Sequence, residues 1–377
     1  MTIERTVKYF TSNEAGKDKE CALKIYGAVA NPGSLTVQEI AKKTLLPVEL
    51  ILEKIKIFEE KKILEKTHDR ADGLCGLRCA EVSGKGFLGI SFDSAGCSMV
   101  VLDSMGEVSR KEKLAVPALK TLRGRVGEIK DIVKNVSNLS TFRGIPLRTA
   151  GLVISESMEG KEKKGISVAA EGLAKAFKCE VLVAKRATAA AYAEKRSNPS
   201  VKDKNMLYLH TDSGEGVVIE GEKITESRAP GRGNESYLRA WDQFDAVRIA
   251  GELVKKGVGT DIVRMVQGNA EDITIKHVLM AAEEGDELAK DLVRRAALAL
   301  GVRAAYLANI FDVDVVTLGG GIEGTDGGFR DHMKESFSRF VLSGMAGKVE
   351  ITGGISGDDV YSLGAALLCR REMFTEV

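Results

Sequence analysis

From Gly86 onward, short apolar runs alternate with longer helical patterns, and this alternation constrains the fold more than any other feature of the chain. The first set of predicted elements comprises strands at 87–93, 98–103, 149–154 and 180–183 and helices at 119–138 and 168–177. A second set, from Met206, comprises strands at 207–210, 216–219 and 314–318 and helices at 243–256, 272–284 and 286–310. Because alternating strands and helices form α/β layers around a mixed or parallel sheet, we expect two successive α/β units.

Length and charge narrow the class of protein further. The 377 residues exceed the roughly 250–300 residues at which single cores stop growing, so we expect two or three folded units. The formal net charge of +1 excludes a globally basic protein held on nucleic acid or membrane by bulk electrostatics. One domain must therefore engage any such partner.

The six cysteines are spread over the whole chain, which is typical of thiols in a reducing compartment. Cys75 and Cys79 lack the further ligands that a structural zinc site needs, so we expect no metal. The N-terminus is charged and has no apolar stretch typical of a signal peptide. Residues 296–311 are the most apolar window, and Arg303 interrupts it. We therefore expect a cytoplasmic protein with no membrane partner.

Residues 17–64 have the pattern of a winged helix-turn-helix. A helix over 17–29 ends at Asn31-Pro32-Gly33, and a second helix begins with the capping-box pair Thr36 and Glu39. Pro47 suits the first position of a third helix. This order of helices is that of a DNA-binding module whose third helix enters the major groove.

The chemistry of the predicted recognition helix fits DNA less well than its pattern does. Its first turns offer glutamates and aliphatic residues instead of the usual base-reading side chains. The candidate DNA-contacting residues are Lys42, Lys43, Glu49, Lys54 and Lys56. The alternative is a solvated helical face that mediates self-association or docks onto a protein.

Several motifs resemble the ROK family of repressors and sugar kinases. The best matches are residues 304–312 (AAYLANIFD) leading into 315–321 (VVTLGGG), and residues 357–366 (GDDVYSLGAA). Residues 212–216 (DSGEG) look like the second phosphate loop of the family. Residues 187–194 (ATAAAYAE) look like the helix that follows its catalytic aspartate.

The resemblance implies a fold and a division into domains. An α/β body with the two lobes of an actin-like, ribonuclease H-like ATPase follows an N-terminal winged helix-turn-helix, as in the family's regulators. We predict a winged helix at 1–80, a first lobe at 81–200 and a second lobe at 201–377, in a homodimer or tetramer. The nucleotide-loop remnants are then Asp93, Gly96, Ser213, Gly214, Gly216, Gly319, Gly320 and Gly321.

Departures from the family pattern bear on catalysis. Arg186 stands where family kinases have the aspartate that takes the proton from the sugar hydroxyl, and an arginine cannot act as a general base. Asp93 matches the metal-associated aspartate of the first phosphate loop only when the register shifts by two residues. Asn234 or Glu235 stands in place of the sugar-binding glutamate, and the family's zinc cysteines are absent. No catalytic residue is therefore assigned.

The candidate ligand-binding residues are Lys185, Arg186, Thr188, Asn234 and Glu235. Two interpretations of the cationic pair Lys185 and Arg186 stay open. The pair binds an anionic ligand such as a sugar phosphate, or it forms an internal ion pair that closes an unused cleft.

Three functions follow from these patterns. The first is a transcriptional regulator that binds DNA through its winged helix and senses a sugar or sugar phosphate in an inactive kinase-like cleft, without a cofactor. The second is a sugar kinase with atypical catalytic residues, which requires ATP and Mg²⁺. The third is a protein-interaction scaffold that has lost both activities.

Overall fold

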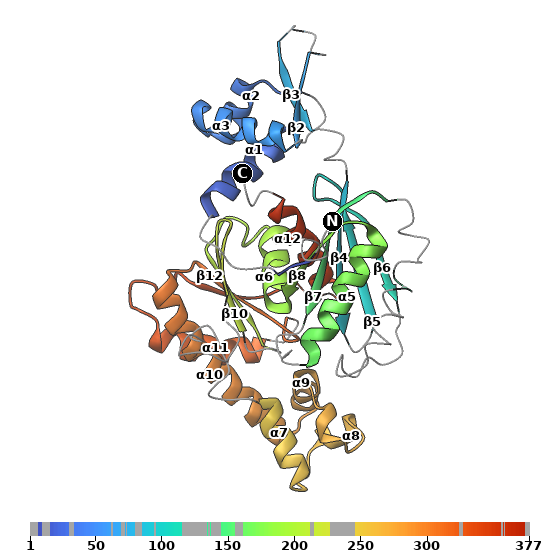
Figure 1. Cartoon of the computed structure of the whole chain (residues 1–377). Helices are drawn as coiled ribbons and strands as arrows, with labels where there is room; N and C mark the ends of the chain where they lie inside the picture. The colour runs from blue at the N-terminus through green and yellow to red at the C-terminus, as the bar shows by residue number, and fades with distance from the viewer. Residues whose placement is uncertain are drawn as a thin grey trace. The chain divides into compact units, whose positions relative to one another are not determined.

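A computed structural model gives the fold of the chain, and Figure 1 shows it as a ribbon. The structure describes residues 7–9, 16–29, 34–61, 63–68, 72, 74–79, 85–93, 96–114, 134, 136, 145–154, 161–211, 215–226, 246–323, 327–355, 357 and 359–373. The chain divides into two compact units. The first unit comprises Met1–Ala193, Gly221–Lys223 and Asp358–Val377, and the second comprises Glu194–Glu220 and Ile224–Gly357.

The first unit begins with the predicted winged helix. It contains α1 (Gly16–Val29), α2 (Val37–Thr44), α3 (Val48–Glu60) and the antiparallel strands β2 (Leu64–Thr67) and β3 (Gly76–Cys79). An isolated bridge between Leu35 and Leu77 extends this small sheet. The predicted capping box is confirmed, because the Glu39 N–H donates to Thr36 Oγ1 and the Thr36 N–H donates to Glu39 Oε2.

The body of the first unit is a six-stranded sheet in the order β1-β8-β7-β4-β5-β6. Its strands are β1 (Val7–Tyr9), β4 (Gly86–Asp93), β5 (Gly96–Leu102), β6 (Val108–Leu114), β7 (Leu147–Ile154) and β8 (Glu180–Lys185). Strands β1, β8, β7 and β4 are parallel to their neighbours, whereas β4, β5 and β6 form an antiparallel meander. The helices are α5 (Lys161–Phe177), α6 (Arg186–Ser197) and α12 (Val360–Glu372).

Helix α12 packs against the sheet and α6 at backbone distance. A methyl group on Gly89 of β4 would lie 1.8 Å from the Ser362 carbonyl oxygen, and one on Gly151 of β7 would lie 2.7 Å from that of Ala365. On the other side, a methyl group on Gly364 would lie 1.9 Å from the carbonyl oxygen of Ala189 in α6. Glycine at these three positions lets α12 fit between the sheet and α6.

The end of α12 also carries a buried charge cluster that reaches the winged helix. Lys19 of α1 is fully buried, and its Nζ lies 2.9 Å from Glu372 Oε1. Arg371 contacts the same carboxylate and lies 3.5 Å from Glu222 Oε2. Tyr192 of α6 donates to Glu222 Oε2 at 2.8 Å. Burial lowers the pKa of Lys19, with a further lowering from the nearby Arg371.

The second unit contains a five-stranded sheet in the order β11-β10-β9-β12-β13. Its strands are β9 (Met206–His210), β10 (Glu215–Glu220), β11 (Lys223–Glu226), β12 (Val315–Gly319) and β13 (Glu350–Gly353). Its helices are α7 (Ala246–Lys255), α8 (Asp261–Met265), α9 (Ile275–Glu283), α10 (Glu287–Phe311) and α11 (Gly327–Phe340), with a 3-10 turn at Ala270–Asp272. Helices α10 and α11 pack directly on each other, since a methyl group on Gly301 would lie 2.2 Å from the Met333 carbonyl oxygen.

The predicted α/β class and the winged helix with an actin-like body are confirmed. The helices predicted at 243–256, 272–284 and 286–310 correspond to α7, α9 and α10, and the helix predicted at 168–177 begins earlier, at Lys161. Most of the helix predicted at 119–138 lies outside the described residues. Among the described residues, no helix is long and apolar enough to cross a bilayer.

Replacing Gly89 with alanine should lower the free energy of unfolding by about 3 kcal/mol or more, because the new methyl group meets a backbone carbonyl that moves only with α12. Urea unfolding of the purified variant measures this change. Gly27→Ala in α1 is the matched control, since nothing lies within 4 Å of its added methyl group. The control should gain about 0.5–1 kcal/mol from the better helix former. Equal effects at the two positions would contradict the close packing of α12.

Candidate functional site

The start of α6 places Arg186 beside the end of β4. Helix α6 begins at Arg186, directly after the last residue of β8. Arg186 Nη2 donates to the Phe92 carbonyl oxygen at 3.1 Å, and Arg186 Cζ lies 4.8 Å from the centroid of the Tyr361 ring. The guanidinium therefore bridges the strand that precedes the β4–β5 turn and the first turn of α12. A cation over an aromatic ring is worth about 0.5–2 kcal/mol, depending on its desolvation.

These contacts bring together residues from three predicted motifs. Asp93 pairs with Gly96 across the β4–β5 hairpin, and Arg186 bonds to the residue that precedes Asp93. Tyr361 comes from the 357–366 motif, which sequence reasoning used only for the family resemblance. The sequence signal for this role was the aromatic residue that follows Gly357 by four positions in that motif.

The other predicted ligand residues of this unit lie in different environments. Lys185 is half-buried at the end of β8. Thr188 is fully buried in the first turn of α6, and its contact with a ligand stays a prediction. Asn234 and Glu235 lie outside the described residues.

In the second unit, the glycines after β12 form a turn whose N–H groups converge on a carboxylate. Gly320 and Gly321 have φ values of 81° and 102°, in the region that favours glycine. The Gly320 N–H donates to Glu323 Oε1 at 2.7 Å. The Gly321 N–H donates to Glu323 Oε2 at 3.0 Å and lies 3.2 Å from Oε1. Sequence reasoning did not single out Glu323, although an acid two residues after a glycine run was visible.

The neighbouring strand holds this turn from the other side. Thr211 follows β9, and its Oγ1 lies 2.9 Å from both the Gly319 and the Gly320 carbonyl oxygens. Gly319 itself closely approaches Tyr208, since a methyl group there would lie 1.8 Å from the Tyr208 hydroxyl. Gly216 is buried in β10, whereas Ser213 and Gly214 lie outside the described residues.

The winged helix displays only part of the predicted DNA-contacting set. Lys42, Lys43, Glu49 and Lys56 are exposed. Lys54 is only 4% exposed, and its Nζ lies 3.9 Å from Glu53 Oε1, which makes it the least accessible of the predicted DNA-contacting residues. Residue 54 lies one turn after the buried Ile51 and next to the buried Ile55, on the face of α3 that meets the winged-helix core.

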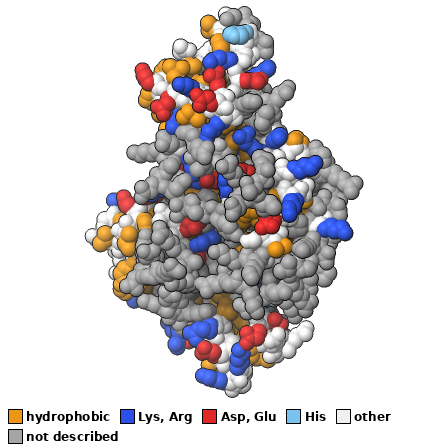
Figure 2. Space-filling view, in the orientation of Figure 1, with side chains coloured by type: hydrophobic (Ala, Val, Ile, Leu, Met, Phe, Trp, Pro, Cys, Tyr) orange, Lys and Arg blue, Asp and Glu red, His pale blue; other side chains and the backbone are white. Residues whose placement is uncertain are grey.

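An apolar tip lies between α2 and α3, and we define it as Leu45, Val48 and Leu52. Their exposed fractions are 89%, 38% and 50%. Leu45 ends α2 with φ 58°, a left-handed conformation in which glycine or asparagine is usual. Figure 2 shows hydrophobic side chains next to acidic ones on the winged helix. Helices α2 and α3 thus expose apolar and acidic side chains beside Lys42, Lys43 and Lys56.

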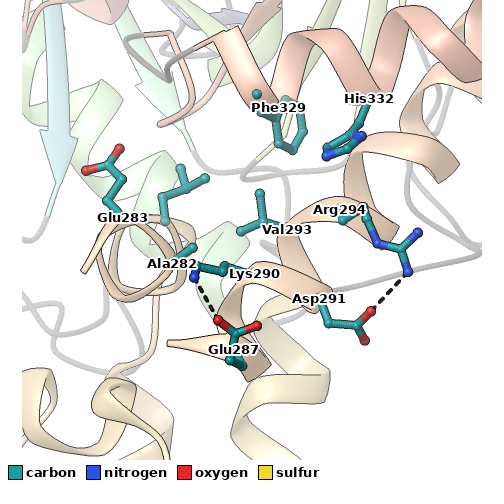
Figure 3. A pocket seen from close by; sticks show the side chains of 11 residues that line it. Ala282, Glu283, Glu287, Lys290, Asp291, Val293, Arg294, Phe329 and His332 are labelled. Atoms are coloured by element: carbon teal, nitrogen blue, oxygen red, sulfur yellow. Dashed lines mark hydrogen bonds and ion pairs between the residues drawn. The ribbon is translucent and has the colours of Figure 1, made fainter. Parts of the chain in front are cut away.

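A pocket of about 440 Å³ opens among α9, α10 and α11 in the second unit (Figure 3). Phe329 and His332 line it from α11, and the charged residues of α10 face it from below. Lys290 pairs with Glu287 at 2.8 Å, and Arg294 pairs with Asp291 at 3.2 Å. None of the predicted site residues lines this pocket, and most of its charged residues are paired along α10.

Comparisons with known proteins confirm the resemblance. Residues 257–372 match the family model of the ROK family. A glucokinase from Streptomyces coelicolor is 24% identical over 213 residues, which cover 50% of this chain and 67% of the relative. The part of the chain after the winged helix has an actin-like α/β fold.

Two solved structures show that fold. A ROK family transcriptional regulator, a homolog of the E. coli MLC protein, superposes with a TM-score of 0.66 at 14% identity, over 95% of this chain and 97% of its own. A ROK glucokinase from Streptomyces griseus, in complex with glucose and AMPPNP, superposes with a TM-score of 0.56 at 20% identity, over 75% of this chain and 98% of its own.

Proposed function

We propose that this chain is a non-catalytic ROK-type regulator whose kinase-like body senses a sugar or a sugar phosphate and whose winged helix binds DNA. The observation that carries the proposal is that Arg186, which the family resemblance assigns to the position of the kinase base, is held against Phe92 and Tyr361. A guanidinium stays protonated at any physiological pH and cannot accept the proton of a sugar hydroxyl. The chain's likeness to a regulator over 95% of its length also supports it.

A sugar kinase is the alternative, because phosphoryl transfer depends largely on positioning and charge stabilisation. The glucokinase relatives favour it, although their identity is low. That activity would need ATP and Mg²⁺. Among the described residues, the Gly320 and Gly321 N–H groups already bond to Glu323, so this turn fits a nucleotide phosphate poorly.

Within the proposed sensor, the contacts of Arg186 favour the internal role over the ligand-binding one. Lys185 remains half-buried at the end of β8, next to the first turn of α6. We assign Lys185 to the anionic group of the ligand. A primary ammonium is a flexible point charge that suits a phosphate.

DNA binding in this proposal depends on Lys42, Lys43 and Lys56. Lys42 and Lys43 lie in the last turn of α2, before the turn that leads into α3. Lysines at this place can contact phosphates and set the position of α3 without reading bases. A docked protein is the second candidate partner of the winged helix. The apolar tip favours it, since Leu45 exposes 89% of its surface beside Glu49, whose charge phosphates repel.

A second copy of the chain is the proposed partner of an apolar patch on the second unit. We define the patch as Tyr306, Ile310, Phe340 and Leu342, which are 45% to 64% exposed. Asn309 joins the two helices here, since it donates to the Phe340 carbonyl and accepts from the Leu342 N–H. The nearby Arg339 pairs with Glu335 at 2.6 Å, so its charge beside the patch is already compensated within the chain. A two-fold pair would match a two-fold DNA site.

Purified protein should transfer no phosphate from ATP and Mg²⁺ to hexoses or N-acetylhexosamines above the rate without protein, because Arg186 cannot act as the base. A coupled ADP assay measures this rate. Turnover that Arg186→Ala alters would contradict the proposal.

Thermal shift with the same sugars and their 6-phosphates tests the sensor, since a ligand of the folded state raises the Tm. A Tm shift that Lys185→Ala abolishes would support it.

DNA binding should weaken steeply with salt, and the double variant Lys42→Ala/Lys43→Ala should reduce the slope of log K against log salt by about 2, at roughly 0.9 per phosphate contact. Fluorescence anisotropy with fragments of random sequence measures this slope. Leu45→Ser/Leu52→Ser is the control that leaves both lysines in place. Wild-type protein that binds no fragment at low salt would favour the second candidate, a docked protein.

Sedimentation velocity should show a dimer that Ile310→Glu converts to a monomer, because the new carboxylate would be buried against a copy of itself. Met280→Glu is the matched control, since Met280 is 49% exposed on α9 and lies outside the patch. A wild-type monomer, or a dimer that survives Ile310→Glu, would rule out the patch as the interface. This result does not depend on DNA binding.

A further inference from the structure

We propose that Glu323 is a built-in anion that occupies the oxyanion site of the glycine turn after β12, so that a phosphate group enters this site only by displacing the Glu323 carboxylate. The inference deepens the proposed function, because it concerns one of the same nucleotide-loop remnants. It stands on the second unit alone. It therefore depends neither on Arg186 nor on the partner of the winged helix.

The turn has the form of an anion site. Two successive N–H groups, of Gly320 and Gly321, point at one carboxylate from residues with positive φ. Successive backbone N–H groups in a turn make a concavity that binds anions such as phosphate. Gly321 also packs closely on α9, since a methyl group there would lie 3.1 Å from Ile275 Cγ2.

The carboxylate of Glu323 satisfies this site from within the same turn. Its two oxygens accept from both N–H groups at 2.7 Å and 3.0 Å, which are the distances of charge-assisted hydrogen bonds. Only two residues separate Gly320 from Glu323, so the carboxylate is held at a high effective concentration. A free oxyanion must overcome both this proximity and the repulsion between two negative charges.

The rest of the turn is built to keep its shape. The Thr211 N–H donates to the Gly319 carbonyl at 2.8 Å, and Thr211 Oγ1 lies 2.9 Å from that carbonyl oxygen and from the next one. Gly319 lies at the end of the buried strand β12, in register with His210 of β9. The N–H groups of Gly320 and Gly321 therefore stay aimed at the same point when the Glu323 side chain leaves. A ligand phosphate, from a nucleotide or from a sugar phosphate, would find a preformed site.

The test compares wild-type protein with Glu323→Ala, using pyrophosphate, ADP and glucose 6-phosphate as probes in isothermal titration calorimetry. We expect at least tenfold tighter binding of one or more of these probes to the variant, because its N–H groups no longer have an internal acceptor. ADP with pyrophosphate would indicate a nucleotide site, and glucose 6-phosphate alone would indicate a sugar phosphate site. Glu335→Ala is the matched control, since it removes the same charge from α11 without touching the glycine turn.

A second measurement uses the intact turn, so that a poorly folded alanine variant cannot obscure the result. In ¹H–¹⁵N NMR spectra at constant pH, the Gly320 and Gly321 amide signals of Glu323→Gln should both differ from those of the wild type, because a neutral acceptor replaces the carboxylate to which their N–H groups donate. The proposal is overturned by amide signals that ignore Glu323→Gln. Equal probe affinities of the folded wild type and Glu323→Ala would overturn it as well. Loss of DNA binding or detection of kinase activity would bear on the proposed function and leave these two measurements unaffected.

Discussion

The contact between α12 and the sheet of the first unit holds both ends of the candidate machinery in place. Three glycines let the α12 backbone approach β4, β7 and α6 so closely that no side chain fits between them. One end of α12 presents Tyr361 to Arg186, and the other end presents Arg371 and Glu372 to the winged helix. Because close-packed interiors transmit displacement instead of absorbing it, these two ends are mechanically linked.

The chain's own charged groups bond to two segments that the family resemblance predicts as phosphate loops. Arg186 bonds to the strand that leads into the first phosphate-loop remnant, and Glu323 bonds to the glycine turn after β12. The two groups have opposite charge and lie in different units, yet each satisfies backbone atoms of a loop remnant. A buried or half-buried backbone polar group left without a partner costs about 1–3 kcal/mol. Internal replacements of this kind therefore let a fold outlive the ligand chemistry for which such loops are suited.

The sequence predicted the elements whose periodicity or capping is strong. The capping box of Thr36 and Glu39 and the long helix α10 match the structure closely, because local patterns determine them. Strands β6, β11 and β13 were not predicted, since they are short or largely exposed edge strands without a clear apolar alternation. The candidate site was harder to predict. The roles of Tyr361 and Glu323, and the burial of Lys54 and Thr188, depend on tertiary contacts that spacing along the chain does not encode.

The buried pair of Lys19 and Glu372 determines how this protein can be dissected. The two residues are separated by 353 positions in the chain, and the ammonium is fully enclosed. A body expressed without the winged helix would keep Glu372 and Arg371 but lose Lys19, the cation that completes the cluster. A winged helix expressed alone would in turn carry Lys19 without the Glu372 carboxylate that pairs with it. The N-terminal module is therefore not an exchangeable cassette, and a chimera would need both sides of this pair to be transferred together.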